Sequence, residues 1–287
     1  MKTKQVFFSF LFLFCLSVSL MAQGKYPDPF LTDEETPDPL LFLPDPPQFM
    51  SSEFYNDYYY YQYGKSLRET DLGEVAKMYE SEPLWAVFSS AIGVVISPEN
   101  TPEIYNLASA AVSDAHKVNT IAKNHFARKR PFAQFNEPSL TPETDEEEKT
   151  TLSYPSGHTT RGWIFAFSLI AVAPDKTEAI MNVAKDYGLS RVICGHHYKS
   201  DIDASFMLAS ALFVNLAVND TYREQLVKAK REYEKIMEEK ASGVKSVEVP
   251  KPSKSIGKVF DLSGRSYDSM PSHGGIFIID NQKVMKR

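Results

Sequence analysis

Three short segments of this 287-residue chain carry side chains that could do chemistry together. The first holds Lys123 and Arg130, the second covers residues 155–158, and the third ends with His197 and Asp201. They supply fixed cations, a glycine-containing turn that can open a helix, and histidines, one of them with a carboxylate four residues later. Cations and helix starts bind anions, and a histidine can act as a nucleophile. The combination suits gripping a phosphate and transferring it through a histidine.

The third segment pairs a histidine with an acid and adds a cation, Arg191. Asp201 follows His197 by four residues, about one helical turn, so its carboxylate can take the proton on one ring nitrogen. That contact fixes the tautomer and leaves the other nitrogen free to attack. His196 is five residues from Asp201, a worse fit to one helical face, so we assign the pair to His197. For the pair alone, a non-catalytic contact at a helix end is the alternative.

The second segment, Pro-Ser-Gly-His at 155–158, precedes an apolar run. Backbone amides at a helix N-terminus form an anion site, and Gly157 lets the backbone come close to a ligand. The Ser156 hydroxyl can donate to a phosphate oxygen, and His158 can point toward the leaving group. The alternative is a turn with a serine cap and a structural histidine.

The first segment places two cations, Lys123 and Arg130, seven residues apart, which returns them to nearly the same helical face. Like charges on one face repel, so a bound anion is expected to compensate them, and arginine can grip phosphate oxygens in bidentate fashion. The alternative is a solvated basic helix end, which the helix dipole favours. We interpret Arg128 and Lys129 as charges of that solvated kind.

The other chemically capable residues fit ordinary roles. His116, His125 and His273 are expected to be structural or exposed. The acidic run 144–148 lies between two of the segments. We favour a solvated loop there over a gate that repels polyanionic substrates. The His, Asp and Glu residues show no metal-ligand spacing such as H-E-x-x-H, so we expect neither a metal nor another cofactor.

The elements that must position these segments are helices. Thr101, Pro102 and Glu103 form a good helix start, and apolar residues follow at helical spacing. This helix should end near Lys129, because the residue before a proline avoids the α region. The nearly all-apolar run 159–173 predicts a buried central helix.

Further helices are expected to about Cys194, from about Asp201 to Val218, and, charged and exposed, over 221–240. Convincing alternating strands are absent before the C-terminal tail. The predicted fold class is therefore all-α, a single helical domain over 67–240 with buried central helices.

The N-terminus reads as a secretory signal peptide over 1–22, with two lysines, an apolar run and a small residue at the expected cut. The run is about 15 residues, short of the roughly 20 that a spanning helix needs, so a membrane anchor is less favoured and no span should remain after cleavage. Cleavage removes Lys2 and Lys4 from 31 Lys and Arg against 37 Asp and Glu, which leaves a net charge of −8. Such an acidic protein is a poor candidate for nucleic-acid binding. Only Cys194 remains, so no internal disulfide can form.

The two ends of the mature chain differ from the helical body. Residues 23–66 are a Pro- and Tyr-rich arm, extended and irregular over 23–50, that should wrap the domain. The tyrosines of 57–63 are interpreted as aromatic packing or a dimer surface rather than a ligand site. Residues 241–256 predict a linker, and 257–287 predict a β-hairpin tail. That tail resembles C-terminal β-tails of exported Bacteroidetes-type proteins, some of which are sorting signals; a hairpin packed on the domain is the other interpretation.

Together, the three segments resemble the signature of the phosphatidic-acid-phosphatase type 2 superfamily: Lys-x6-Arg-Pro, Pro-Ser-Gly-His and Ser-Arg-x5-His-x3-Asp. Every signature position is filled, by Lys123, Arg130, Pro131, Pro155, Ser156, Gly157, His158, Ser190, Arg191, His197 and Asp201. Within that superfamily the chain looks like a bacterial class A non-specific acid phosphatase over about residues 38–235. The resemblance leaves out the C-terminal tail.

The resemblance implies hydrolysis of small-molecule phosphomonoesters over a broad range, at acidic pH and without a metal. His197 would form a phosphohistidine, Asp201 would orient its ring, and His158 would protonate the departing alkoxide. The phosphate oxygens would be held by Lys123, Arg130, Ser156, Gly157 and Arg191. The family also suggests a homodimer or larger homo-oligomer. The expected location is the periplasm or the medium, or the cell surface if the tail is a sorting signal.

Two rival functions are kept. Vanadium-dependent haloperoxidases resemble this chain at the cationic pocket, although they are usually much longer, so an oxidoreductase is the sharpest chemical rival. A non-catalytic surface or binding protein is suggested by the tyrosine-rich segment and the tail. Membrane lipid-phosphate phosphatases share the signature but need several spanning helices. Which phosphomonoester is physiological cannot be read from the pocket.

Overall fold

The computed structural model describes residues 27–242 and four short strands between 259 and 286, without 262–265, 268–274 and 280–281. The signal peptide predicted for 1–22, most of the linker predicted for 241–256, and His273 lie outside the described residues. Residues 27–242 contain helices and no strand, which confirms the all-α class for that part. Its elements are the 3-10 helices η1 (Pro39–Leu41), η2 (Pro142–Thr144) and η3 (Pro174–Lys176), and α2 (Phe54–Ser66), α3 (Asp71–Ser81), α4 (Leu84–Ile92), α5 (Pro102–Phe126), α6 (Pro131–Phe135), α7 (Asp145–Glu148), α8 (Gly157–Val172), α9 (Thr177–Cys194), α10 (Lys199–Val218) and α11 (Asp220–Ala241).

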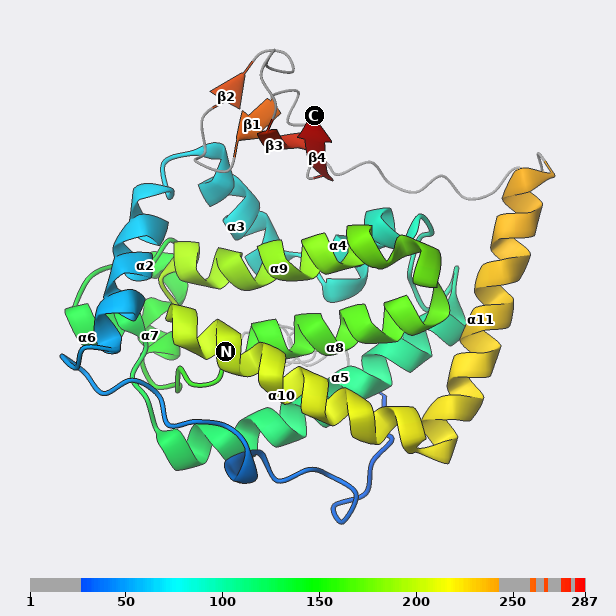
Figure 1. The fold of residues 1–287 in the computed structure, drawn as a ribbon, viewed down its shortest axis with the longest axis horizontal. Helices are drawn as coiled ribbons and strands as arrows, with labels where there is room; N and C mark the ends of the chain where they lie inside the picture. Colours follow the sequence, from blue (N-terminus) through cyan, green and yellow to red (C-terminus); the bar gives the residue numbers. More distant parts are fainter. Residues whose placement is uncertain (1–26, 243–258, 262–265, 268–274, 280–281, 287) are drawn as a thin grey trace, which may run out of the picture.

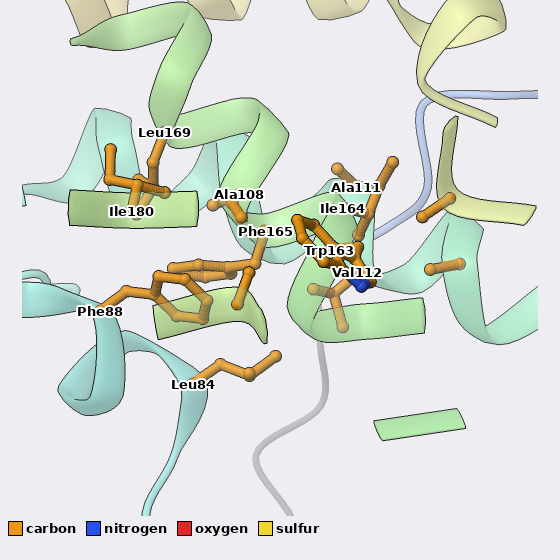
Figure 2. Close-up of a cluster of buried hydrophobic side chains, with 14 of the residues drawn as sticks. Leu84, Phe88, Ala108, Ala111, Val112, Trp163, Ile164, Phe165, Leu169 and Ile180 are labelled. Atoms are coloured by element: carbon orange, nitrogen blue, oxygen red, sulfur yellow. The ribbon is translucent and has the colours of Figure 1, made fainter. Parts of the chain in front are cut away.

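Helix α8 lies at the centre of the bundle, in contact with α5, α9 and α10 (Figure 1). Its Ile164, Phe165 and Leu169 side chains are buried in the cluster that Figure 2 shows. The ring of Phe165 lies 5.4 Å from the ring of Phe88 in α4, measured between centroids. Burying each such side chain stabilises the fold by about 1.5–3 kcal/mol. The predicted buried central helix is confirmed, and it begins at Gly157.

The first turn of α5 is completed by α11. The Glu232 carboxylate of α11 accepts hydrogen bonds from the backbone N–H groups of Glu103 and Ile104, at 3.3 and 2.9 Å. These are amides that a helix start leaves without partners in the helix itself. The charged helix predicted over 221–240 is present and most of its charged side chains are exposed, but it also buries Tyr222 and Tyr233, so it is not exposed on every side.

The far end of α5 comes earlier than expected. The helix stops at Phe126, where Ala127 adopts a left-handed conformation with φ of 49°. The predicted end near Lys129 was therefore wrong. Lys123 stays in the last turn of α5, whereas Arg130 lies beyond the turn as the residue before α6. The two cations do not share one helical face, as their spacing had suggested.

The segment before α2 follows the helical body (Figure 1). The Asp114 carboxylate of α5 accepts from the backbone N–H groups of Phe30 and Leu31, both at 3.0 Å. Burial raises the pKa of Asp114 to about 6. Further along, the Tyr154 hydroxyl donates to the carbonyl of Pro44 at 2.7 Å. These bonds tie the proline-rich segment to the helices that carry the site.

The four described strands follow the helical body. They are β1 (Val259–Asp261), β2 (Ser266–Tyr267), β3 (Gly275–Ile279) and β4 (Gln282–Lys286), antiparallel in the order β2-β1-β3-β4. The hairpin tail predicted for 257–287 falls partly on residues outside those described, and its role stays a prediction.

One of the described helices, α10, is long and apolar enough to cross a membrane by length and composition. It packs against α8, α5 and α11, as a core helix of a globular domain does.

Candidate active site

The start of α8 and the start of α10 are bonded to each other. The backbone N–H of Ser156, just before α8, donates to the carbonyl of Asp201 at 3.3 Å. In return, the Ser205 hydroxyl of α10 donates to the carbonyl of Ser156 at 2.9 Å. Since α9 ends only five residues before α10 begins, three helix ends meet at this point. The second and third sequence segments are thus brought together.

His197 lies in the turn between α9 and α10. Gly195 ends α9 with φ of 84°, a conformation that suits glycine. The Asp201 carboxylate accepts from the Tyr198 backbone N–H at 2.8 Å and so caps α10. His197 Nδ1 lies 3.4 Å from Oδ2 of the same carboxylate, to which the Ser153 hydroxyl also donates. The spacing of four residues therefore gives the contact that it predicts.

Arg130 covers the other nitrogen of the imidazole. Its Nη1 lies 3.0 Å from His197 Nε2, and its Nη2 lies 2.6 Å from a carboxylate oxygen of Glu148. The Nε–H donates to the Thr151 hydroxyl at 2.7 Å. With Arg130 in this place, His197 is only 1% exposed. A ligand that reacts at Nε2 must therefore take the position that the guanidinium now holds.

Arg191 is buried on the other side of the turn. Its Nη1 pairs with the Glu80 carboxylate of α3, and its Nη2 lies 2.7 Å from His196 Nδ1. Its Nε has no hydrogen-bond partner among the described residues. Burial, together with Arg191 and Arg130, lowers the pKa of His196 to about 2. His196 thus acts as a neutral acceptor for an arginine and does not contact Asp201.

Lys123 reaches the site from the last turn of α5, and its ammonium donates to the carbonyl of Leu152. A Cβ placed on Gly157 would lie 3.7 Å from Lys123 Cε and 3.3 Å from Asn119 Oδ1, so α8 begins directly against this side chain. Burial and the charge of Arg130 lower the pKa of Lys123 to about 7. The lysine is therefore a cation that titrates near neutrality.

Ser156 and His158 flank the first residue of α8. The Ser156 hydroxyl accepts from the Thr159 backbone N–H at 3.3 Å and from the Thr159 hydroxyl at 2.9 Å, which caps the helix. His158 is partly exposed and makes no hydrogen bond to the described part of the chain. Burial of the ring, then the charge of Arg191, lowers its pKa well below the ordinary value.

Burial and the positive charges of Arg130, Lys123 and Arg191 affect the pKa of His197. Burial lowers the pKa of its imidazole well below the ordinary value, and the charges of Arg130, Lys123 and Arg191 lower it further. His197 is therefore neutral at pH 7, the form in which a ring nitrogen can attack. An incoming anion would bring the opposite charge to the same place.

Arg128 contradicts its sequence interpretation as a solvated charge. Its side chain is only 9% exposed and bridges two carboxylates, Asp57 and Asp201, each at 2.6 Å. The guanidinium also lies 4.0 Å from the centroid of the Tyr198 ring. Asp57 in turn accepts from the backbone N–H of Ser200 at 2.8 Å. Sequence reasoning missed this network because Asp57 is 71 positions before Arg128, with no local pattern to join them.

The acidic run 144–148 is not a uniformly solvated loop, so that expectation was wrong for two of its residues. Glu148 pairs with Arg130, as described above. Asp145 is buried and accepts from the backbone N–H of Ser139 at 3.1 Å. Glu146 and Glu147 are exposed.

The remaining candidates lie away from this centre. His116 and His125 are exposed, and Cys194 is buried and free. Within the part of the chain that the structure describes, no three His, Cys, Asp or Glu residues are grouped as a metal site would require.

Known proteins match the part of the chain that builds this site. Residues 104–224 match the PAP2 superfamily. A protein named non-specific acid phosphatase from Providencia stuartii is 36% identical over 211 residues, which cover 72% of this chain and 85% of that protein. A non-specific acid phosphatase from Salmonella typhimurium is 28% identical over 225 residues, covering 77% and 90%. An acid phosphatase from Zymomonas mobilis is 30% identical over 223 residues, covering 77% and 84%.

Proposed function

Because this chain belongs to the PAP2 superfamily, we infer that its histidines and cations hydrolyse phosphomonoesters, as an acid phosphatase does. The reaction is a phosphoryl transfer, in which positioning and charge stabilisation supply most of the catalysis. The described site offers both, with a fixed imidazole and several cations around it.

The nucleophile in this proposal is Nε2 of His197. Asp201 accepts the Nδ1 proton, which leaves the Nε2 lone pair to attack phosphorus. As the N–P bond forms, the P–O bond to the alcohol breaks, and His158 gives its proton to the leaving oxygen. Water then attacks the phosphohistidine and returns a proton to His158, which releases phosphate. A bound phosphate raises the pKa of His158 because the opposite charge favours the protonated ring.

The phosphate oxygens are held by cations and by the start of α8. In the structure the guanidinium groups of Arg130 and Arg191 contact the carboxylates of Glu148 and Glu80, and a bound phosphate would replace these carboxylates. The Ser156 hydroxyl accepts two hydrogen bonds and keeps its own hydrogen to donate. The proposed holding groups are the side chains of Lys123, Arg130, Arg191 and Ser156 and the backbone amide of Gly157.

The orientation of the His197 ring is the single observation that carries this proposal. Nδ1 lies 3.4 Å from Asp201 and Nε2 lies 3.0 Å from Arg130. We expect His197→Ala to abolish phosphate release from phenyl phosphate, and wild-type protein quenched during turnover to carry acid-labile, base-stable phosphate. His125→Ala, at an exposed histidine of α5, is the matched control. An active His197→Ala variant, or the same acid-labile, base-stable phosphate on that variant, would refute the assignment.

The arm predicted over 23–66 is wrong for its last part, because residues 54–66 form helix α2. We also propose that the mature protein is exported, with residues 1–22 removed, and that the described part of the arm, residues 27–53, lies along the domain. The signal-peptide pattern and the bonds of Phe30, Leu31 and Pro44 support this. The site needs no metal in this proposal, and a homo-oligomer and a sorting role for the tail remain predictions. N-terminal sequencing of protein from the periplasm or the medium tests the cleavage; a mature chain that still begins at Met1 would contradict it.

A further inference from the structure

Arg161 differs from the other arginines around the site. Arg128, Arg130 and Arg191 each pair with at least one carboxylate. Arg161, in α8, has no hydrogen bond, ion pair or stacked ring among the residues that the structure describes, and it is partly exposed. A guanidinium presents five donors in a planar fork that matches carboxylate and phosphate geometry. Its donors are therefore available to an anion from solution.

The position of Arg161 follows from the helix that carries it. It comes three residues after His158, so the two side chains lie on the same face, about 4.5 Å apart along the axis. Its charge contributes to the lowered pKa values of His158, Lys123 and the exposed His116. Arg161 is therefore close to the site on the side of α5, and faces the surface rather than the buried turn of His197.

The chemistry of the leaving group places part of the substrate beside Arg161. If His158 protonates the leaving oxygen, the alcohol must lie against His158 while the phosphate lies toward His197. The next residue along that face of α8 is Arg161. An alcohol that carries a negative group a few bonds from its ester oxygen would bring that group to the free guanidinium.

We propose that Arg161 is a specificity-determining residue that binds a second anionic group on the alcohol part of the substrate. The favoured substrates are then phosphomonoesters of hydroxy acids and bisphosphates, and esters of neutral alcohols are hydrolysed less efficiently. This inference rests on the proposed function, because it uses His158 as the group nearest the leaving oxygen.

The test compares substrates that differ in one charge. We would measure kcat/KM for phenyl phosphate, 3-carboxyphenyl phosphate, its neutral analogue 3-carbamoylphenyl phosphate, and a phenyl ester with a second phosphate at the same position. In Arg161→Gln the ratio of carboxyphenyl to carbamoylphenyl kcat/KM should fall about fivefold, the effect of losing one exposed ion pair. Arg161→Lys should keep part of the ratio. Comparing kcat/KM for the carboxylated ester with kcat/KM for the ester that carries a second phosphate shows which anion Arg161 prefers.

Lys185→Gln is the matched control, since Lys185 is an exposed cation of α9 without an ion pair in the described residues. It should leave the ratio unchanged. An equal change for charged and neutral esters in Arg161→Gln, or the same fall in Lys185→Gln, would overturn the inference. If wild-type protein released no phosphate from any ester, the proposed function itself would fail, which is a different outcome.

Discussion

The two histidines of the site are held in opposite ways. His197 lies in a closed network, with Asp201 at one ring nitrogen, Arg130 at the other, and Arg128 behind the carboxylate. His158 makes no hydrogen bond to the described residues and is partly exposed at the start of α8. In the proposed mechanism, the ring that attacks phosphorus would be held in place before substrate arrives, whereas the ring that meets a variable alcohol would be free to adjust.

The cations follow the same division. On the His197 side each arginine contacts a carboxylate, and on the His158 side Arg161 contacts none within the described chain. A preorganised site loses little freedom when it binds the group that every substrate shares. An adjustable site tolerates many leaving groups. If the proposed function is right, this contrast would let one pocket bind phosphate strictly and accept many alcohols, with Arg161 favouring the anionic ones.

Removing the free histidine should give the largest difference between substrates. His158→Ala should lower kcat/KM, which reports the cleavage of the ester and not the later hydrolysis of the phosphohistidine, by about 10²- to 10⁴-fold for an alkyl phosphate, because its leaving oxygen needs a proton. The loss should be much smaller for p-nitrophenyl phosphate, whose leaving group departs without one. Steady-state rates over a series of leaving groups measure this. Equal losses across the series would mean that His158 is not the acid.

Breaking the closed network should affect kcat for every substrate alike. Arg128→Met leaves Asp57 and Asp201 as buried carboxylates without their cation, which should lower the free energy of unfolding by about 3–5 kcal/mol. Displacement of the His197 ring should lower kcat by up to about 10²-fold. Denaturant unfolding and steady-state kinetics measure the two effects.

A pH profile separates positioning from folding for Arg128. Without this cation, Asp201 stabilises protonated His197 more strongly, so the acid limb of kcat should move to higher pH. Arg128→Lys keeps a charge and should restore most of the limb. Because Arg128→Met could fail to fold, Asp57→Asn serves as a second variant: it removes the carboxylate that shares Arg128 with Asp201, so the acid limb should move to lower pH. An unmoved acid limb in both variants would leave Arg128 with a purely structural role.

The sequence predicts local contacts well and distant ones poorly. Four residues separate His197 from Asp201, so helix geometry alone predicts their contact. Arg128 has no such neighbour: one partner is 71 positions before it and the other 73 after it. Its sequence surroundings, beside Lys129 and Arg130, are those of a solvated basic run. Only the packing of α2 and α10 shows that the charge is buried and paired.

The fold shows the same limit at the end of α5. Pro131 indicates that a helix should stop before Arg130, but the left-handed turn at Ala127 has no signal, because residues other than glycine seldom adopt it. That turn moves Arg130 off the axis of α5 and toward His197. Central helices such as α8 can be predicted because a long apolar run is stable only when it is buried in the core.

Lys123 should give the cationic side a pH dependence of its own. Its pKa of about 7 means that the ammonium is present below neutrality and lost above it. kcat/KM should therefore fall about tenfold from about pH 6 to about pH 8, since this quantity reports groups of the free enzyme. Lys123→Arg keeps its charge and should flatten that part of the profile. Identical wild-type and variant profiles would assign the fall to another group.

The smallest predicted effect concerns Glu148, whose carboxylate forms an ion pair with Arg130. Glu148 lies 2.6 Å from Nη2 of Arg130, whose Nη1 lies 3.0 Å from His197 Nε2. In the proposed mechanism, a phosphate must displace this carboxylate before Nε2 can react. Since Glu148 is 24% exposed at its side chain, its ion pair is worth about 1 kcal/mol, or roughly fivefold in affinity. Glu148→Gln should therefore lower the inhibition constant of inorganic phosphate by about fivefold.

Glu147→Gln provides the control for that measurement, because it removes the same charge from an exposed neighbour that has no ion pair in the described residues. If simple repulsion by the acidic run governed phosphate entry, both variants would tighten inhibition equally. If Glu148 instead holds Arg130 ready for phosphate, Glu148→Gln would weaken inhibition. Tighter inhibition in Glu148→Gln alone would show that even the closed side of the site must open at Arg130 before His197 can react.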